Sequence, residues 1–584
     1  MFWNLDDLYL SFESPEFLAD FEGVKQDIAD LTKWAMENFT NMDNPAEKLV
    51  SFINRQNAYK RGSKLMIFSM LHSAADTDNL AAKKYVGLLQ MEFAQMAQPS
   101  VLFRSFVGKL DNLQELIDAN PVLKEHEYIL SEIKRKNRYL LSEKEEVLFA
   151  KMRTTGSSAW NEMKEALCAT LMIPVVVEGE EKVLPLSALR NLAYDANQET
   201  RKAAYEAELK GYEQVERAVA AALNAIKGEV LTNVAMRGYE SPQHMTLVES
   251  RMDKETLDAM IGAMEDFLPS FRRYFKKKAE LLGHKNGLPW YDIFAPVGKV
   301  EMKFTYEEAC DFILENFYKF SKRLGDFTKF GIENGWVDWP MRKGKRGGAF
   351  CMNIHAIGQS RVLLNFDGSF SNVTTFAHEF GHAYHGDCLK DKTSMNSSYT
   401  MPIAETASNF CETIVFNAAV KNANEDEKFV LLEGAISDAL QVIVDIYSRY
   451  LFENRLFEAR AKGPLSVEEI KELMVQAQKD AYGDGLDHEY LHPYMWINKP
   501  HYYFADRNFY NFPYAYGMMF SQGLYAQYLI EGESFVQKYD ELLAATGSAS
   551  LEQVGDLAGI DVRKKDFWVN SLKLVEERID EFCK

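Results

Sequence analysis

With 584 residues, the chain is long enough to hold two or three domains and to bury a large core. Hydrophobic residues make up 47% of it, an ordinary fraction for a soluble globular protein, and the net charge of −20 argues against a nucleic-acid partner. The acidic amino terminus lacks a basic n-region and no apolar run approaches membrane-spanning length, so we expect neither a signal peptide nor a membrane partner. Six scattered cysteines without paired spacing indicate reduced thiols and a cytoplasmic location.

Most of the chain is expected to be helical, because apolar residues recur at spacings of three and four and proline is sparse. Two long helices are expected at residues 212–234 and 254–282. Within the second, residues 262–266 read Gly-Ala-Met-Glu-Asp, close to the GAMEN signature of M1-type aminopeptidases. In those enzymes the signature lies a few dozen residues before the metal-binding HExxH motif. Here more than a hundred residues separate it from the HExxH sequence at residues 378–382. We therefore interpret this stretch as part of an ordinary amphipathic helix.

Strand signals are few. A run of β-branched residues on each side of a Glu-Gly-Glu-Glu turn predicts a hairpin at residues 173–184. Residues 350–357 and 361–365 predict a second strand pair. No linker or repeat divides the chain sharply, and we place an N-terminal helical lobe at residues 1–200 and a catalytic lobe at residues 201–584.

The chemistry of the chain is concentrated in an HExxH motif formed by His378, Glu379 and His382. On a helix the two histidines leave the same face and can bind one metal ion. Glu379 stands beside the first ligand, where its carboxylate can act as general base on a metal-bound water. The alternative, a helix that merely carries two histidines, fits poorly with the uncharged residues around the motif.

A catalytic zinc needs a third protein ligand and an open position. The metzincin pattern fails, because His385 and Cys388 stand where it needs Gly and His, and we interpret His385 as a residue that packs in the core or supports a ligand and does not itself bind the metal. After Pro402 a small, apolar segment carries Glu405 and Glu412, seven residues apart and so on one helical face. Carboxylates there are costly unless they meet a cation.

We therefore predict Glu405 as the third ligand and Glu412 as a carboxylate that orients a ligand histidine. The alternatives are an ordinary acid near a helix N-terminus for Glu405, favoured by the dipole, and an ordinary surface acid for Glu412.

Residues 366–382, followed by Ala404, Glu405 and Glu412, resemble the thimet-oligopeptidase family of zinc peptidases, and more closely its oligoendopeptidase F branch. Residues 3–9, 237–241 and 345–351 and a C-terminal aromatic block agree, so the resemblance covers nearly the whole chain. It implies a mainly α, zincin-type fold: a large helical two-lobed peptidase with a deep central channel and a small β-sheet near the active site.

The resemblance also implies that an aromatic block at residues 488–517 supplies donors to the oxyanion of the reaction. His501 and Tyr510 match the family best by spacing, and Tyr503 and Tyr514 are further candidates. The chain departs from the family at Phe512, where relatives carry a tyrosine. The alternative is that the block is a cluster of aromatic core and wall residues.

Together these features predict a zinc-dependent oligoendopeptidase that binds one Zn²⁺ per chain and hydrolyses internal bonds of short, unfolded peptides. An edge strand near residues 350–355 is expected to pair with the substrate backbone. A basic run from Arg342 to Arg346 is either a solvated loop or a loop that steers a peptide carboxylate. Two other functions stay open, a metallocarboxypeptidase and a non-enzymatic peptide-binding protein. The sequence leaves the oligomeric state unknown.

Overall fold

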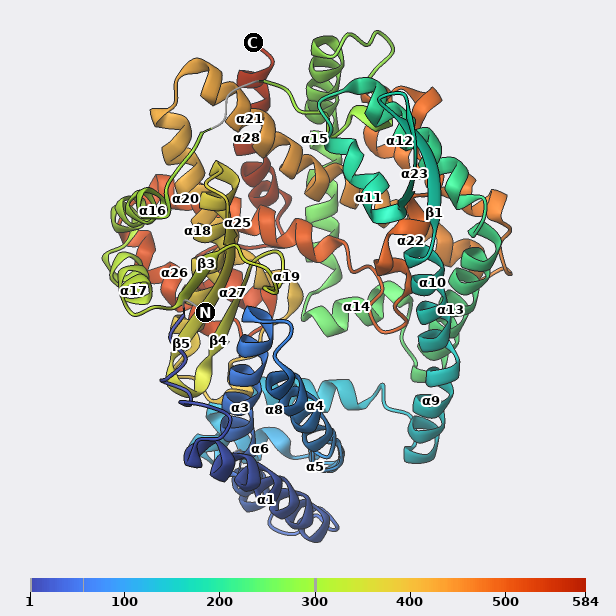
Figure 1. The fold of residues 1–584 in the computed structure, drawn as a ribbon. Helices are drawn as coiled ribbons and strands as arrows, with labels where there is room; N and C mark the ends of the chain where they lie inside the picture. The colour runs from blue at the N-terminus through green and yellow to red at the C-terminus, as the bar shows by residue number, and fades with distance from the viewer. Residues whose placement is uncertain (1–2, 56, 299–301) are drawn as a thin grey trace. The chain divides into compact units, whose positions relative to one another are not determined.

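A computed structural model gives the fold (Figure 1) and describes residues 3–55, 57–298 and 302–584. The chain forms two compact units, each built from three segments. Unit 1 comprises Met1–Arg138, Glu301–Lys421 and Gln527–Ile560, and unit 2 comprises Tyr139–Val300, Asn422–Ala526 and Asp561–Lys584. The units thus interleave along the chain, whereas the sequence suggested one boundary near residue 200. Glycine and proline breaks mark turns but do not reveal which segments pack together, and the division into lobes stays a prediction.

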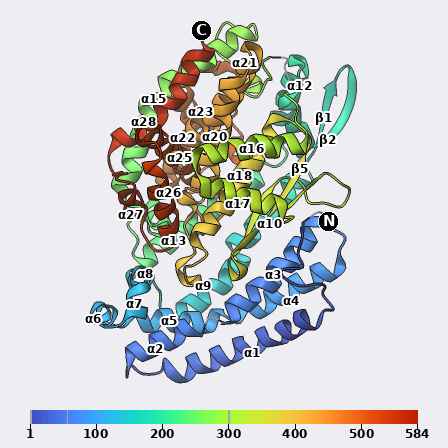
Figure 2. The ribbon, with the colours of Figure 1, turned by 90° about the vertical axis from the view of Figure 1, so that its left-hand side faces the viewer.

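The N-terminal helices of unit 1 pack around a shared apolar core (Figure 2). On α1 (Pro15–Asn38), Phe17, Val24 and Ile28 lie on the buried face, and Ser14 caps the helix by accepting a hydrogen bond from the Phe17 amide. The helices that follow are α2 (Pro45–Asn54), α3 (Asn57–Ala75), α4 (Leu80–Ala94), α5 (Ala97–Gly108), α6 (Leu113–Asp118), α7 (Pro121–Glu125) and α8 (Glu127–Asn137).

A three-stranded sheet packs against the helix of the HExxH motif, α18 (Phe370–Leu389), in unit 1. β5 (Gln359–Phe366) is central; β3 (Val337–Pro340) pairs with it in parallel and β4 (Phe350–Ile354) in antiparallel register. Within the described chain β4 is therefore an edge strand, as expected. The other helices of this unit are α16 (Tyr306–Phe320), α17 (Lys322–Glu333), α19 (Met401–Ala404), α20 (Thr406–Asn422), α26 (Ser534–Ala545) and α27 (Leu551–Leu557).

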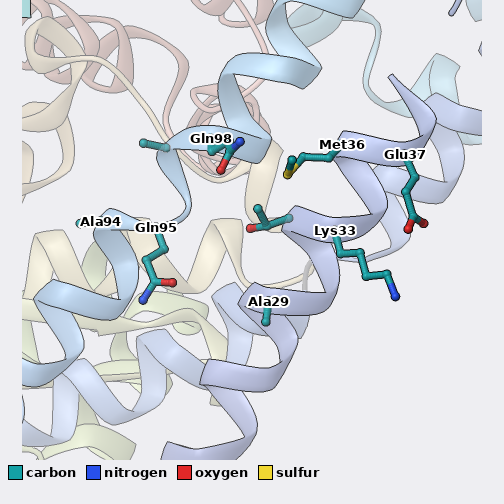
Figure 3. Close-up of a pocket in the computed structure, with 9 residues that line it drawn as sticks. Ala29, Lys33, Met36, Glu37, Ala94, Gln95 and Gln98 are labelled. Atoms are coloured by element: carbon teal, nitrogen blue, oxygen red, sulfur yellow. The ribbon is translucent and has the colours of Figure 1, made fainter. Parts of the chain in front are cut away.

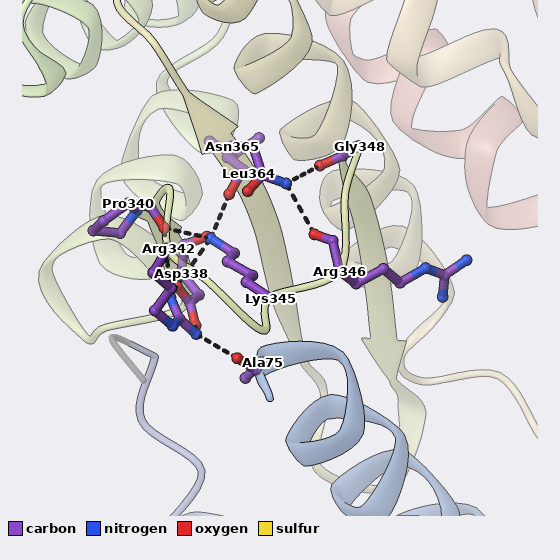
Figure 4. A network of polar contacts seen from close by, with 9 residues as sticks. All are labelled: Ala75, Asp338, Pro340, Arg342, Lys345, Arg346, Gly348, Leu364 and Asn365. Carbon is purple, nitrogen blue, oxygen red and sulfur yellow. Dashed lines mark hydrogen bonds and ion pairs between the residues drawn. The ribbon is translucent and has the colours of Figure 1, made fainter. Parts of the chain in front are cut away.

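The basic run between β3 and β4 is tied to the fold through the buried Asp338 (Figure 4). Arg342 donates two hydrogen bonds to the Asp338 carboxylate, at 2.6 and 2.7 Å, and a third to the Ala75 carbonyl at 2.9 Å. Lys345 Nζ lies 3.1 Å from Asp338 Oδ1, and its side chain is 0% exposed. The interpretation as a solvated loop is wrong for these two residues, because the sequence did not reveal that Asp338 on strand β3 neutralises them.

Unit 2 contains the predicted hairpin, formed by β1 (Met172–Val177) and β2 (Glu180–Pro185). The linking residues Glu178 and Gly179 both have positive φ, as a tight turn between twisted strands requires. Its helices are α9 (Glu143–Thr155), α10 (Ser157–Ala169), α11 (Leu186–Asn191), α12 (Gln198–Tyr212), α13 (Glu216–Arg237), α14 (Pro242–Ser250), α15 (Lys254–Leu281), α21 (Glu425–Leu440), α22 (Ile446–Arg460), α23 (Val467–Tyr482), α24 (Met495–Asn498) and α28 (Lys565–Phe582), while α25 (Phe512–Glu531) runs from this unit into unit 1.

The mainly α fold with a small sheet is confirmed, and so are both predicted strand pairs. Residues 262–266 lie inside α15, as expected. One helix differs: α13 begins at Glu216 and not at residue 212, because a turn separates it from α12 without interrupting the apolar spacing. Strand β3 was missed, since four residues are too few to show alternation. None of the described helices is both long and apolar enough to cross a membrane.

Candidate active site

The two histidines of the motif lie side by side on α18. Ser369 caps this helix by accepting a hydrogen bond from the Asn372 amide, and the helix packs its apolar face against β4 and β5. Because His378 and His382 are four residues apart, their imidazoles converge, and their Nε2 atoms are 3.2 Å apart. Both side chains are about one-fifth exposed, so an ion and a substrate can reach them.

Gly381 lets the following helix approach α18 closely. A Cβ atom at this position would lie 2.4 Å from the Ala407 carbonyl oxygen and 2.5 Å from the Ser408 Cα, both backbone atoms of α20. Only glycine therefore permits this packing of α18 on α20. The sequence showed this glycine, but not the backbone contact that requires it.

Glu405 lies at the junction between α19 and α20, opposite the two histidines. Its Oε2 atom is 3.3 Å from the Nε2 atoms of both His378 and His382. Ser408 Oγ donates a hydrogen bond of 2.9 Å to the same oxygen and so fixes the carboxylate. Among the residues that the structure describes, these three form a group whose possible ligand atoms all lie within 4.8 Å of one another.

This spacing fits a tetrahedral zinc ion. Zinc bonds to imidazole nitrogen and carboxylate oxygen are about 2.0–2.1 Å long, so two ligands of a regular tetrahedron stand roughly 3.3 Å apart. The three separations of 3.2–3.3 Å match this edge. The donor set also fits, since two imidazoles and one carboxylate leave the fourth position for water or substrate.

Glu412 contacts the other side of His378. Its Oε1 atom is 3.0 Å from His378 Nδ1. A carboxylate at that nitrogen favours the tautomer that carries its proton on Nδ1, which leaves the Nε2 lone pair facing Glu405 and His382. Burial lowers the pKa of His378, but the hydrogen bonds with Glu405 and Glu412 outweigh it and raise the pKa to about 10.

Glu379 follows His378 on α18 and is nearly buried. The residue is 6% exposed, and burial raises the pKa of its carboxyl above the ordinary value. A carboxylate with a raised pKa holds a transferred proton more readily at neutral pH.

Asn353 on β4 was not identified from the sequence. Its Nδ2 donates a hydrogen bond of 3.0 Å to the His382 carbonyl, and its Oδ1 accepts one of 2.7 Å from Ser360 Oγ. The edge strand β4 and helix α18 are thereby joined at His382. No sequence signal marks such a contact, because the two residues are 29 positions apart.

His385 does not join the ligand group. It is fully buried, its ring stacks on Tyr399 with centroids 4.2 Å apart, and its Nε2 lies 2.8 Å from Thr546 Oγ1. The structure therefore gives it the packing role that the sequence analysis assigned.

His501, Tyr510 and Tyr514 form a cluster in unit 2. The His501 ring is 5.4 Å from Tyr510 and 6.2 Å from Tyr514 by ring centroid, and all three are partly exposed. Burial, together with the charge of Arg449, lowers the pKa of His501 to about 4, so the imidazole is neutral at pH 7.

Tyr503 stands apart from this cluster. It is 1% exposed, and its hydroxyl donates a hydrogen bond of 3.0 Å to the Trp496 carbonyl. Its donor is engaged within the core, which departs from the expectation that it faces the substrate.

A surface pocket on α1, α4 and α5 (Figure 3) contains none of the candidate site residues; Ala29, Lys33, Gln95 and Gln98 are among those that line it.

The geometry predicts the effect of filling the contact between α18 and α20. Gly381→Ala should force the helices apart, lowering the free energy of unfolding by about 1–3 kcal/mol and zinc affinity by roughly tenfold or more. Chemical denaturation and zinc titration measure the two effects. Gly87→Ala, in α4 where a Cβ meets nothing within 4 Å, is the control and should be neutral or stabilising. Equal zinc affinity in G381A and wild type would contradict the proposed contact.

The chain resembles known proteins over nearly its whole length. A profile of peptidase family M3 matches residues 191–574, and one named oligopeptidase F matches residues 110–172. Oligopeptidase PepF of Bacillus subtilis is 26% identical over 99% of this chain and 86% of its own length. An oligoendopeptidase F homolog of Lactococcus lactis subsp. lactis is 24% identical over 100% and 96%.

Solved structures share the fold. A crystal structure from Chlamydophila abortus has a TM-score of 0.85 at 20% identity, covering 100% of this chain and 97% of that one. Oligoendopeptidase-F from Enterococcus faecium has a TM-score of 0.71 at 19% identity, covering 97% and 98%. Since the family profile spans most of the sequence and includes both the HExxH helix and Glu405, the chain belongs to peptidase family M3.

Proposed function

We propose that the protein is a zinc-dependent oligoendopeptidase that hydrolyses internal bonds of short, unfolded peptides. Family membership makes it a peptidase acting on oligopeptides. The observation that carries the metal assignment is the convergence of His378, His382 and Glu405 at the edge lengths of a zinc tetrahedron. One ion per chain follows from one such group among the described residues.

The contacts of the metal-site residues support the following roles. A bound zinc supplies Lewis acidity to the attacking water and to the scissile carbonyl. The Glu379 carboxylate removes a proton from the attacking water and delivers it to the leaving amine nitrogen. Glu412 holds the Nδ1 proton of His378, which keeps that ring oriented, and Asn353 fixes the turn of α18 that carries His382.

Donors to the developing oxyanion are the second part of the proposal. We assign His501 and Tyr510 to this role, with Tyr514 beside them. A neutral imidazole can donate one N–H, and a phenol can donate its O–H. Tyr503 would support this segment from the core through its bond to Trp496.

The edge strand supports a peptide substrate. Among the described residues β4 pairs only with β5, so its other edge would offer backbone N–H and C=O groups to an extended chain. Such pairing recognises the main chain and would tolerate many sequences. We propose short peptides as the substrates and the cytoplasm as the location, in keeping with six free cysteines.

The products of two substrates test this function. A decapeptide blocked at both ends should be cut at internal bonds, while casein should be left largely intact, because the deep channel that the family resemblance implies would admit only short chains. Mass spectrometry of the products measures both. Release of only terminal residues would favour the carboxypeptidase alternative, and efficient digestion of casein would contradict the restriction to short substrates.

A further inference from the structure

Unit 2 contains a cavity of about 150 Å³ whose contents the proposed reaction does not explain. A cavity needs only about 10–15 Å³ to hold one water, so this space is large enough for a small ligand. Trp290, Tyr291 and Phe294 give it an apolar wall, and Arg190, Glu208, His492 and Lys499 contribute polar groups.

Most charges around the cavity are paired within the protein. Arg190 Nε is 3.1 Å from Glu208 Oε1, and the buried Arg201 donates a hydrogen bond of 2.7 Å to Asp292. Asp445, which also lines the cavity, forms an ion pair with Arg449. In each pair one positive charge neutralises one negative charge, so each of these three carboxylates already has a basic partner.

Lys499 is the cation that has no such partner. No hydrogen bond or ion pair to its Nζ is found in the part of the chain that the structure describes. Burial, reinforced by the charge of Arg449, lowers the pKa of Lys499 to about 8. Lys499 is partly buried, and the carboxylates of Asp445 and Glu208 offset this effect only in part, so an anion in the cavity would stabilise its ammonium further.

His492 supplies a second unsatisfied group in the same cavity. It is 1% exposed, its Nε2 lies 3.5 Å from Glu208 Oε1, and its Nδ1 has no hydrogen-bond partner among the described residues. Buried imidazole nitrogens are normally satisfied, so a missing partner points to a ligand or an ordered water.

We propose that this cavity binds a small carboxylate ligand with an apolar body. The carboxylate would accept hydrogen bonds from Lys499 and from the guanidinium of Arg190, and the apolar body would lie against Trp290 and Phe294. The two sources of such a carboxylate are a free acid, such as an amino-acid derivative, and the C-terminus of a peptide. The proposal does not depend on the metal chemistry.

N-acetyl-leucine is a suitable probe, and calorimetric titration of the zinc-loaded protein measures its binding. We expect saturable binding, no binding of N-acetyl-leucinamide, and at least tenfold weaker binding to Lys499→Met. Lys462→Met, which removes an exposed charge from the same unit, should bind like wild type. Unchanged binding in K499M would place the probe elsewhere, for instance on the zinc, and overturn the proposal; so would equal binding of the amide or no binding at all.

Two further measurements keep the test decisive. Thermal unfolding should show K499M to be at least as stable as wild type, since the change removes a partly buried charge that forms no ion pair within the described chain and nearly keeps the side-chain volume. If K499M does not fold, Arg190→Gln takes its place, and unchanged binding in folded R190Q contradicts the site. In an E379Q background, displacement of N-acetyl-leucine by a blocked pentapeptide with a free C-terminus would assign the site to chain ends. No displacement would assign it to free acids, and either result supports a carboxylate site.

Discussion

Replacing Glu379 with glutamine should reduce kcat by about 10²- to 10⁴-fold while leaving one zinc per chain. The amide has the shape of the carboxylate but cannot accept a proton from the attacking water. Glu379 is not one of the three residues that form the possible metal site, so the zinc content should not change. Metal analysis by atomic emission and steady-state kinetics on a blocked peptide measure both quantities.

The pattern of the two readouts distinguishes a general base from a structural residue. A Glu379→Asp control retains the carboxylate on a shorter side chain and should recover part of the lost rate. Loss of zinc in E379Q would show that the residue is needed for the metal site. Near-normal kcat with zinc bound would remove Glu379 from the mechanism.

Glu405→Ala should abolish zinc binding and, with it, activity. The change removes the oxygen that lies 3.3 Å from both imidazole nitrogens and leaves two ligands instead of three. Circular dichroism should show unchanged helix content, because a fold of this size does not depend on one ion.

Glu412→Ala, seven residues further along the chain in α20, is the matched control. It touches only the Nδ1 side of His378, so zinc affinity should fall by roughly 10- to 100-fold and not be abolished. If E412A lost zinc more completely than E405A, the two carboxylates would have exchanged roles.

The sequence predicted the site residues that lie close together along the chain better than the contacts between distant segments. His378 and His382 could be placed because four residues on a helix fix a common face, and Glu405 and Glu412 followed from the cost of acids in an apolar segment. The contacts of Gly381 with α20 and of Asn353 with His382 could not be predicted, since they depend on how helices and strands approach one another in space.

The aromatic block shows a second limit. His501, Tyr510 and Tyr514 cluster together, but Tyr503 turns into the core, although it is only two residues from His501. In the short turn that carries both residues, neighbouring side chains point in different directions. Four residues are too few for the spacing of apolar residues to indicate which side chain is buried. The interleaving of the two units is hidden for the same reason, because it depends on contacts between distant segments.

Restoring zinc to metal-free protein tests the central claim most directly. Activity on the blocked decapeptide should be absent after stringent metal removal and should rise in proportion to added zinc, with a sharp end point at one ion per chain. His378→Ala protein should not recover under the same titration. Full activity of the metal-free protein, or an end point that H378A shares, would contradict a catalytic zinc held by His378, His382 and Glu405.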